Sequence, residues 1–168
     1  MNIVVIGAGE VGLYITRLLT DPKHQTQPMN VSVIDPDSAR MKQLDGSLDA
    51  AMVNGNGSHP EILQLAGIQE ADLLVAVSSN DEVNLIADLY ARNMGVNKSI
   101  VRIEADEIKQ ASKEEPWFLG GEPPDLIFDP DEDTAREIAD LLDSWGADEI
   151  ATLGDGQVAV IGVTINDE

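Results

Sequence analysis

The chain has 168 residues, no cysteine, and 31 acidic against 10 basic side chains, which gives a net charge of −21. This charge repels nucleic-acid phosphates and anionic lipid, so we expect no nucleic-acid partner, and without a long apolar run we expect no insertion into a membrane. The lack of cysteine excludes disulfides and thiolate metal sites. The length suits one main domain. The acidic excess favours a surface that stays soluble in very high salt, and the alternative is an ordinary acidic protein.

Short apolar segments alternate with segments of helical periodicity along the chain. Apolar residues recur with helical spacing from Val11 and again from Val83, which predicts two helices with one buried face each. The apolar segments are short enough to be strands buried on both faces. They cover residues 3–6, 31–34, 50–53, 73–77, 100–103 and 126–128. This alternation predicts the α/β class, with a doubly wound, Rossmann-like parallel sheet.

Several polar residues mark helix ends. Ser58 lies three residues before Glu61, which predicts a capping box, and Gly67 is placed to end the same helix. Asp129, which is followed by proline, predicts the N-cap of a later helix. The segment 113–125 is rich in Pro, Gly and Glu, and we interpret it as a loop.

The pattern changes after Trp145, where two β-like runs around Asp155 and Gly156 predict a hairpin. We therefore expect a dinucleotide-binding domain over residues 1–143. Residues 144–168 would then form a linker and the start of a second, β-rich lobe, with the natural chain continuing beyond them.

The glycines near the N-terminus follow the pattern G-x-G-x-x-G. Gly7, Gly9 and Gly12 come directly after a predicted strand and open a predicted helix. In a dinucleotide site the first glycine makes the tight turn, the second lets backbone approach the pyrophosphate, and the third lets helix and strand pack closely. The context therefore predicts a dinucleotide site.

Asp35 ends the second predicted strand, 23 residues after Gly12. At this position a carboxylate accepts hydrogen bonds from the adenosine ribose and repels a 2′-phosphate, which favours NAD over NADP. The alternative is that Asp35 is only a turn residue before Pro36. No general acid or base for hydride transfer stands out, because His59 falls in the first turn of a short helix.

Three stretches carry a family resemblance: "VVIGAGEVG", "VSVIDPDSARMKQL" and above all "VNGNGSHPEILQLAGIQEADLLVAVSSNDEVNLIA". Over about residues 1–143 the chain resembles the N-terminal nucleotide-binding domain of the Trk potassium-uptake regulators, the TrkA or RCK/KTN family. In that family such domains are not enzymes. They bind NAD(H), or ATP or ADP in some branches, form rings, and couple nucleotide occupancy to opening of a membrane potassium transporter.

The resemblance implies a cytoplasmic homo-oligomer at the inner face of the cell membrane, held there by a Trk-type transporter subunit. The implied cofactor contacts are Gly7, Ala8, Gly9, Glu10, Val11, Gly12, Asp35, Asn56, Ser78, Ser79 and Arg102. Glu10 stands where ATP-binding branches carry Arg, and its carboxylate would oppose a γ-phosphate, so NAD(H) is favoured over ATP or ADP. Asn56 replaces the Asp or His of other members, so it is assigned only to the adenine end.

Other interpretations stay open from the sequence. Arg102 could instead form an ordinary ion pair with Glu104 or Asp106. The chain could also be the NAD-binding domain of an oxidoreductase that lacks its substrate domain, or a module that senses another nucleotide. Asp81 would favour the cationic, oxidised nicotinamide if it lay beside that ring.

Overall fold

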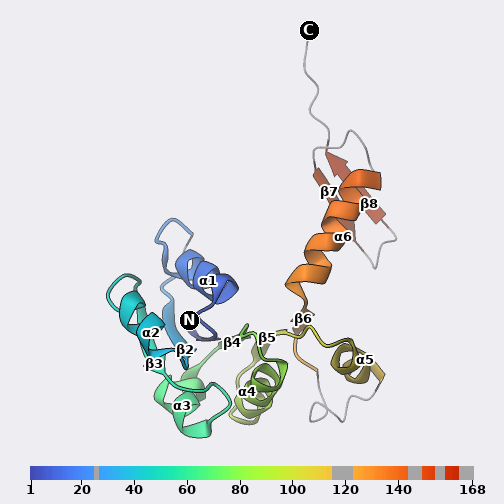
Figure 1. Ribbon diagram of the computed structural model, residues 1–168. Helices are drawn as coiled ribbons and strands as arrows, with labels where there is room; N and C mark the ends of the chain where they lie inside the picture. The colour runs from blue at the N-terminus through green and yellow to red at the C-terminus, as the bar shows by residue number, and fades with distance from the viewer. Residues whose placement is uncertain (25–26, 115–122, 144–148, 154–157, 163–168) are drawn as a thin grey trace. The chain divides into compact units, whose positions relative to one another are not determined.

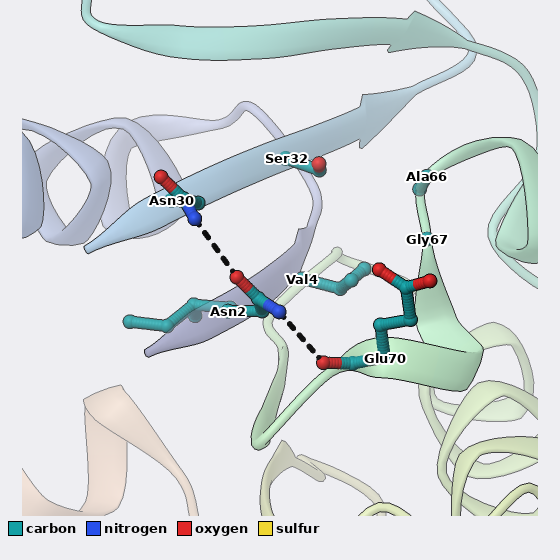
Figure 2. Close-up of a pocket in the computed structure, with 8 residues that line it drawn as sticks. Asn2, Val4, Asn30, Ser32, Ala66, Gly67 and Glu70 are labelled. Atoms are coloured by element: carbon teal, nitrogen blue, oxygen red, sulfur yellow. Dashed lines mark hydrogen bonds between the residues drawn. The ribbon is translucent and has the colours of Figure 1, made fainter. Parts of the chain in front are cut away.

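The computed structural model describes residues 1–168 except 25–26, 115–122, 144–148, 154–157 and 163–168 (Figure 1). Backbone packing divides the chain into two compact units, Met1–Phe128 and Asp129–Glu168. The division differs from the boundary expected at residue 143, because the last helix groups with the residues that follow it. The extent of the nucleotide-binding domain stays a prediction.

The first unit is built on a six-stranded parallel sheet of order β3-β2-β1-β4-β5-β6. Its strands are β1 (Asn2–Ile6), β2 (Asn30–Asp35), β3 (Ala50–Asn54), β4 (Leu73–Ala76), β5 (Lys98–Arg102) and β6 (Leu126–Phe128). Central strands such as β1 are buried on both faces, which is why they read as uninterrupted apolar runs. The doubly wound α/β fold is therefore confirmed.

Helices cover both faces of this sheet, and Figure 1 shows α1 on one side of the strands with α3 and α4 on the other. The helices and the short 3-10 turn are α1 (Glu10–Thr20), α2 (Ser38–Leu44), α3 (Pro60–Leu65), η1 (Ile68–Glu70), α4 (Asp81–Asn93) and α5 (Asp106–Glu114). One apolar core lies under α1 and α2 and includes Val5 and Val75. The other lies under α3, α4 and α5 and includes Val4 and Leu74.

The start of α3 differs from the sequence prediction. His59 is its N-cap residue and makes no side-chain capping bond. Both the N–H and the hydroxyl of Ser58 donate to Asn56 Oδ1 at 2.9 Å, so the predicted capping box does not form. The reason is local competition, because Asn side chains readily close a turn with the residue two positions later. The predicted end is confirmed, since Gly67 follows the helix with φ of +82°.

The predicted loop at 113–125 is wrong at its beginning, because α5 extends through Glu114. The central part of that segment, residues 115–122, lies outside the described residues. None of the helices in the described ranges is both long and apolar enough to cross a membrane.

The second unit contains α6 (Pro130–Asp143), β7 (Glu149–Leu153) and β8 (Val158–Gly162). Asp129 caps α6 as predicted, because its Oδ1 accepts from the backbone N–H groups of Asp131 at 3.0 Å and Glu132 at 3.2 Å. Strands β7 and β8 pair antiparallel, with Ile150 opposite Ile161. The expected turn at Asp155 and Gly156 lies outside the described residues.

Candidate functional site

The candidate site lies at the carboxyl ends of β1, β2 and β4, where the strand order reverses direction. The chain builds outward from β1 to β3 on one side and from β4 to β6 on the other. At such a switch point the loops that follow adjacent strands diverge and leave a crevice, which is where ligands of open α/β sheets bind. Most of the residues assigned from the sequence lie at the ends of these strands, in the loops that follow them or in the first turn of α1.

Two of the three motif glycines are required by the protein itself. Gly7 has φ of +97°, and a Cβ atom there would lie 2.8 Å from Ser78 Cα. Its N–H donates to the Ile34 carbonyl at 2.8 Å, which fixes the turn against β2. At Gly12 an added Cβ would lie 1.9 Å from the Gly7 carbonyl oxygen. These contacts bring the glycine turn, the start of α1 and the end of β4 into direct packing.

Gly9 is different, because nothing in the protein requires a glycine there. Its φ is −69°, and an added Cβ would meet no described atom within 4 Å. Gly9 is the N-cap of α1 and provides no side-chain capping bond to the first-turn N–H groups. An open, uncapped helix N-terminus is a natural site for an anionic group such as a pyrophosphate.

The neighbours of Gly9 divide between surface and core. Glu10 is exposed in the first turn of α1, where its carboxylate adds negative charge beside the open helix end. Ala8 is 2% exposed, and Val11 packs against the core under α1 and α2. The side chains of Ala8 and Val11 therefore serve the packing of the domain, and the assignment of both residues as cofactor contacts stays a prediction.

Asp35 lies against the glycine turn and is 5% exposed, and its predicted contact with a ribose stays a prediction. Its Oδ2 accepts from the Ala8 N–H at 2.7 Å, and its Oδ1 accepts from the Asp37 N–H at 2.8 Å. Arg40 Nη1 lies 3.5 Å from Oδ2. The residue thus also makes the turn before α2 that was the alternative interpretation, and one carboxylate ties both loops together.

Asp37 caps α2 beside this carboxylate. Its Oδ1 accepts from the N–H groups of Ala39 at 3.0 Å and Arg40 at 3.1 Å. The hydrogen bond from the Arg40 backbone holds the pKa of Asp37 below its ordinary value, since it favours the ionised carboxylate. The cap is therefore complete above the ordinary pKa of Asp and is lost as the pH falls through the lowered value.

Ser78 is held by a residue that the sequence analysis missed. Asn84 is fully buried in α4, and its Oδ1 accepts from the Ser78 N–H at 3.0 Å and from the Ser78 hydroxyl at 2.7 Å. Its Nδ2 donates to the Ser78 carbonyl at 2.9 Å. The sequence held one sign of this role: Asn84 is an amide within the helix whose apolar face begins at Val83. Ser79, by contrast, is exposed and makes no hydrogen bond within the described part of the chain.

Arg102 and Asp81 both contact the segment after β5. Arg102 forms an ion pair with Glu104, which is the ordinary interpretation left open above. Asp81 Oδ2 accepts from the N–H groups of Glu104 at 3.0 Å and Ala105 at 2.9 Å. The Asp81 carboxylate is therefore committed to the connection between β5 and α5.

Asn56 lies in the loop after β3, and its side-chain oxygen is occupied by Ser58. The glycines beside it serve packing, because a Cβ at Gly55 would meet Ile62 and one at Gly57 would meet Ile6, each at 2.5 Å. The assignment of Asn56 to the adenine end stays a prediction.

Comparison with known proteins identifies the family of this chain. The family model of the TrkA-N domain matches residues 3–115. The chain belongs to the TrkA-N family. A Trk system potassium uptake protein TrkA homolog of Archaeoglobus fulgidus is 36% identical over 167 residues, which cover 98% of this chain and 36% of the relative. The chain thus spans about a third of the length of that relative.

Solved structures share the fold of this TrkA-N domain. The TrkA-N domain of the inner membrane protein YbaL of Escherichia coli superposes with a TM-score of 0.68 at 21% identity, over 84% of this chain and 96% of that one. The GsuK channel bound to NAD gives 0.61 at 22% identity, over 84% of this chain and 23% of that one. GsuK bound to ADP superposes with a TM-score of 0.61 at 20% identity, over 85% of this chain and 34% of that one.

Proposed function

We propose that this TrkA-N domain binds NAD(H) and regulates a Trk-type potassium-uptake system according to nucleotide occupancy. The observation that carries the proposal is the pairing of an open glycine N-cap at Gly9 with the buried carboxylate of Asp35. The first suits a pyrophosphate, and the second suits ribose hydroxyls. Because Gly9 satisfies no steric need of the chain, a ligand that approaches its backbone supplies the missing reason for a glycine.

The order of groups along the site matches a dinucleotide. The adenosine ribose belongs at Asp35, the pyrophosphate at the first turn of α1, and the nicotinamide half toward Ser79, which is exposed beyond the end of β4. The GsuK structures with NAD and with ADP support an adenine nucleotide in this fold. We favour NAD(H) over ATP because Glu10 places a carboxylate beside the helix N-terminus.

The proposed partner is the membrane subunit of a Trk-type transporter, to which the domain would dock from the cytoplasm. Support comes from the relative named as a Trk system potassium uptake protein. Self-association is part of the proposal, and exposed apolar side chains on two helices favour it. Tyr14 on α1 is 63% exposed, and Ile86 on α4 is 49% exposed.

We propose a sensor and not a catalyst. A hydride-transfer enzyme needs a general acid or base beside its substrate. At the ends of β2 and β4, the side chains of Asp35, Ser78 and Asn84 are bound to neighbouring backbone or to one another. These bonds hold the loops in place, which suits a binding site that reports whether a nucleotide is present.

Potassium flux tests the regulatory role. The gene product is supplied to cells that hold its Trk-type transporter but lack a regulator, and potassium uptake is followed as the NADH pool is varied. We expect uptake to change with NADH in the parent and to lose this response in Gly9→Val, at a position where an added Cβ meets no described atom within 4 Å. Uptake that responds equally in both proteins, or in neither, would contradict the proposal.

A further inference from the structure

Asn84 joins the ends of two neighbouring strands through one side chain. Besides its three bonds to Ser78, its Nδ2 donates to the Arg102 carbonyl at 3.0 Å. Ser78 follows β4, and Arg102 is the last residue of β5. The amide therefore fixes the distance between the two loops that leave these strands.

The chemistry of the four contacts requires an amide. Oδ1 faces an N–H and a hydroxyl, whereas Nδ2 faces two carbonyl oxygens, so every hydrogen-bonding position of the side chain is used. The orientation of the amide follows from these partners, because a flipped group would set its oxygen against two acceptors. A carboxylate of the same shape would also set an oxygen against these two carbonyl acceptors. Because the position is fully buried, water could not replace the lost hydrogen bonds.

The first turn of α4 is anchored on both sides of this amide. Asp81, one turn before Asn84, binds the two N–H groups that follow β5, at Glu104 and Ala105. Asn80 caps α4 by accepting from the Val83 N–H at 2.7 Å. Ser79 is exposed, and both of its neighbours are fixed: Asn84 binds Ser78, and Asn80 caps α4.

Ser78, which Asn84 binds, also packs against the glycine turn. The Ser78 backbone packs so closely on Gly7 that an added Cβ would lie 2.8 Å from it. The gap between the pyrophosphate loop and Ser79 is therefore set by where Asn84 holds Ser78. On the basis of the proposed function, we infer that Asn84 is a positioning residue for the nicotinamide half of the dinucleotide. It acts through Ser78 and Arg102, and the adenosine half does not depend on it.

The test compares two ligands in the matched variants Asn84→Asp and Asn93→Asp. Asn93 lies on the same helix but is exposed and binds only the Leu89 carbonyl. NADH and AMP are titrated into each protein, because AMP lacks the nicotinamide half. We expect Asn84→Asp to weaken NADH about tenfold or more and AMP less than about twofold, whereas Asn93→Asp changes neither.

A pH series separates positioning from a general loss of structure. Burial disfavours the ionised form of the carboxyl that Asn84→Asp introduces, and a protonated carboxyl regains one donor. As the pH falls from about 8 to about 5, the NADH-to-AMP affinity ratio of Asn84→Asp should therefore recover relative to that of Asn93→Asp. Equal weakening of both ligands, or an unchanged ratio, would overturn the inference. If Asn84→Asp does not fold, Ser78→Ala carries the test, since it deletes one bond to the same amide. It should weaken NADH about threefold more than AMP, and equal effects would again overturn the inference.

Failure of the proposed function gives a different result. A parent protein that binds AMP but not NADH would remove the dinucleotide assignment itself. If the parent binds NADH and the NADH-to-AMP affinity ratio of Asn84→Asp equals that of the parent, the proposed function stays intact. Only the role of Asn84 is then removed.

Discussion

Asp35 serves the fold and the proposed ligand with the same carboxylate. It accepts the Ala8 N–H at 2.7 Å and the Asp37 N–H at 2.8 Å, and it is almost completely buried. A carboxylate already fixed by two backbone donors loses little entropy when ribose hydroxyls bind it. The position 23 residues after the last motif glycine predicts the ribose contact but not these two bonds.

Replacing Asp35 by Ala should weaken NADH binding by roughly 1.5–3 kcal/mol, because charge-assisted hydrogen bonds to the ribose are lost. The measurement is a calorimetric titration of both proteins. Asp72→Ala is the matched control, since Asp72 also accepts a backbone N–H, from Asn2 at 2.7 Å, but at the opposite end of the sheet. Equal affinity in Asp35→Ala and the parent would refute the ribose assignment.

Gly9→Val should abolish binding of both NAD and NADH while leaving the melting temperature close to that of the parent. A Cβ added at Gly9 meets no described atom of the protein within 4 Å, so we expect the side chain to obstruct the ligand rather than the fold. Gly12→Ala provides the contrast, because its Cβ would lie 1.9 Å from the Gly7 carbonyl oxygen and must destabilise the fold. Thermal unfolding with and without NADH checks both, and a Gly9→Val protein that still gains stability from NADH would contradict the site.

At the scale of elements, α4 depends on its polar start. Asn80→Ala should lower the free energy of unfolding by about 1 kcal/mol, because the Val83 N–H loses its capping oxygen. Ser79→Ala serves as control, since this neighbouring side chain is exposed and should be near neutral for stability. Urea unfolding followed by circular dichroism measures both, and an Asn80→Ala midpoint equal to that of Ser79→Ala would show that the cap contributes nothing.

The elements differ in how far the sequence predicts them. β1 and β2 were predictable because strands buried on both faces read as apolar runs. α5 was not, because Ile108 is its one large apolar residue among nine, most of them polar or charged. At the site, the spacing of the motif glycines and Asp35 predicts that they meet at the carboxyl ends of β1 and β2, and Asp35 does bind the glycine turn through the Ala8 N–H.

The role of Asn84 could not be predicted, for a physical reason. Its partners are the Ser78 carbonyl, six residues away, and the Arg102 carbonyl, 18 residues away, and these meet only when β4 and β5 pair. Local pattern identifies which side chains can form hydrogen bonds but not which backbone groups the topology will bring to them. Ser58 differs for a local reason, because its hydroxyl was predicted to cap α3 and instead binds Asn56, two residues earlier.

For the whole molecule, the charge of −21 should make stability depend on salt. Self-repulsion among the acids is relieved as ions screen it, so the free energy of unfolding should rise from about 0.1 M to about 2 M KCl. Denaturation with urea, which leaves ionic strength unchanged, measures this at each KCl concentration. A protein equally stable at both ends of the series would contradict the salt adaptation inferred from composition.

The central claim for the whole molecule is that this TrkA-N domain senses a nicotinamide dinucleotide. The most direct measurement is calorimetric titration of the chain with NADH, NAD, ATP and ADP side by side, at a KCl concentration where it is fully folded. We predict that NADH and NAD bind at one site per chain, each about tenfold or more tighter than ATP, because Glu10 opposes a γ-phosphate beside the α1 N-terminus. ATP binding tighter than either dinucleotide, or no heat from any of the four ligands, would contradict the account.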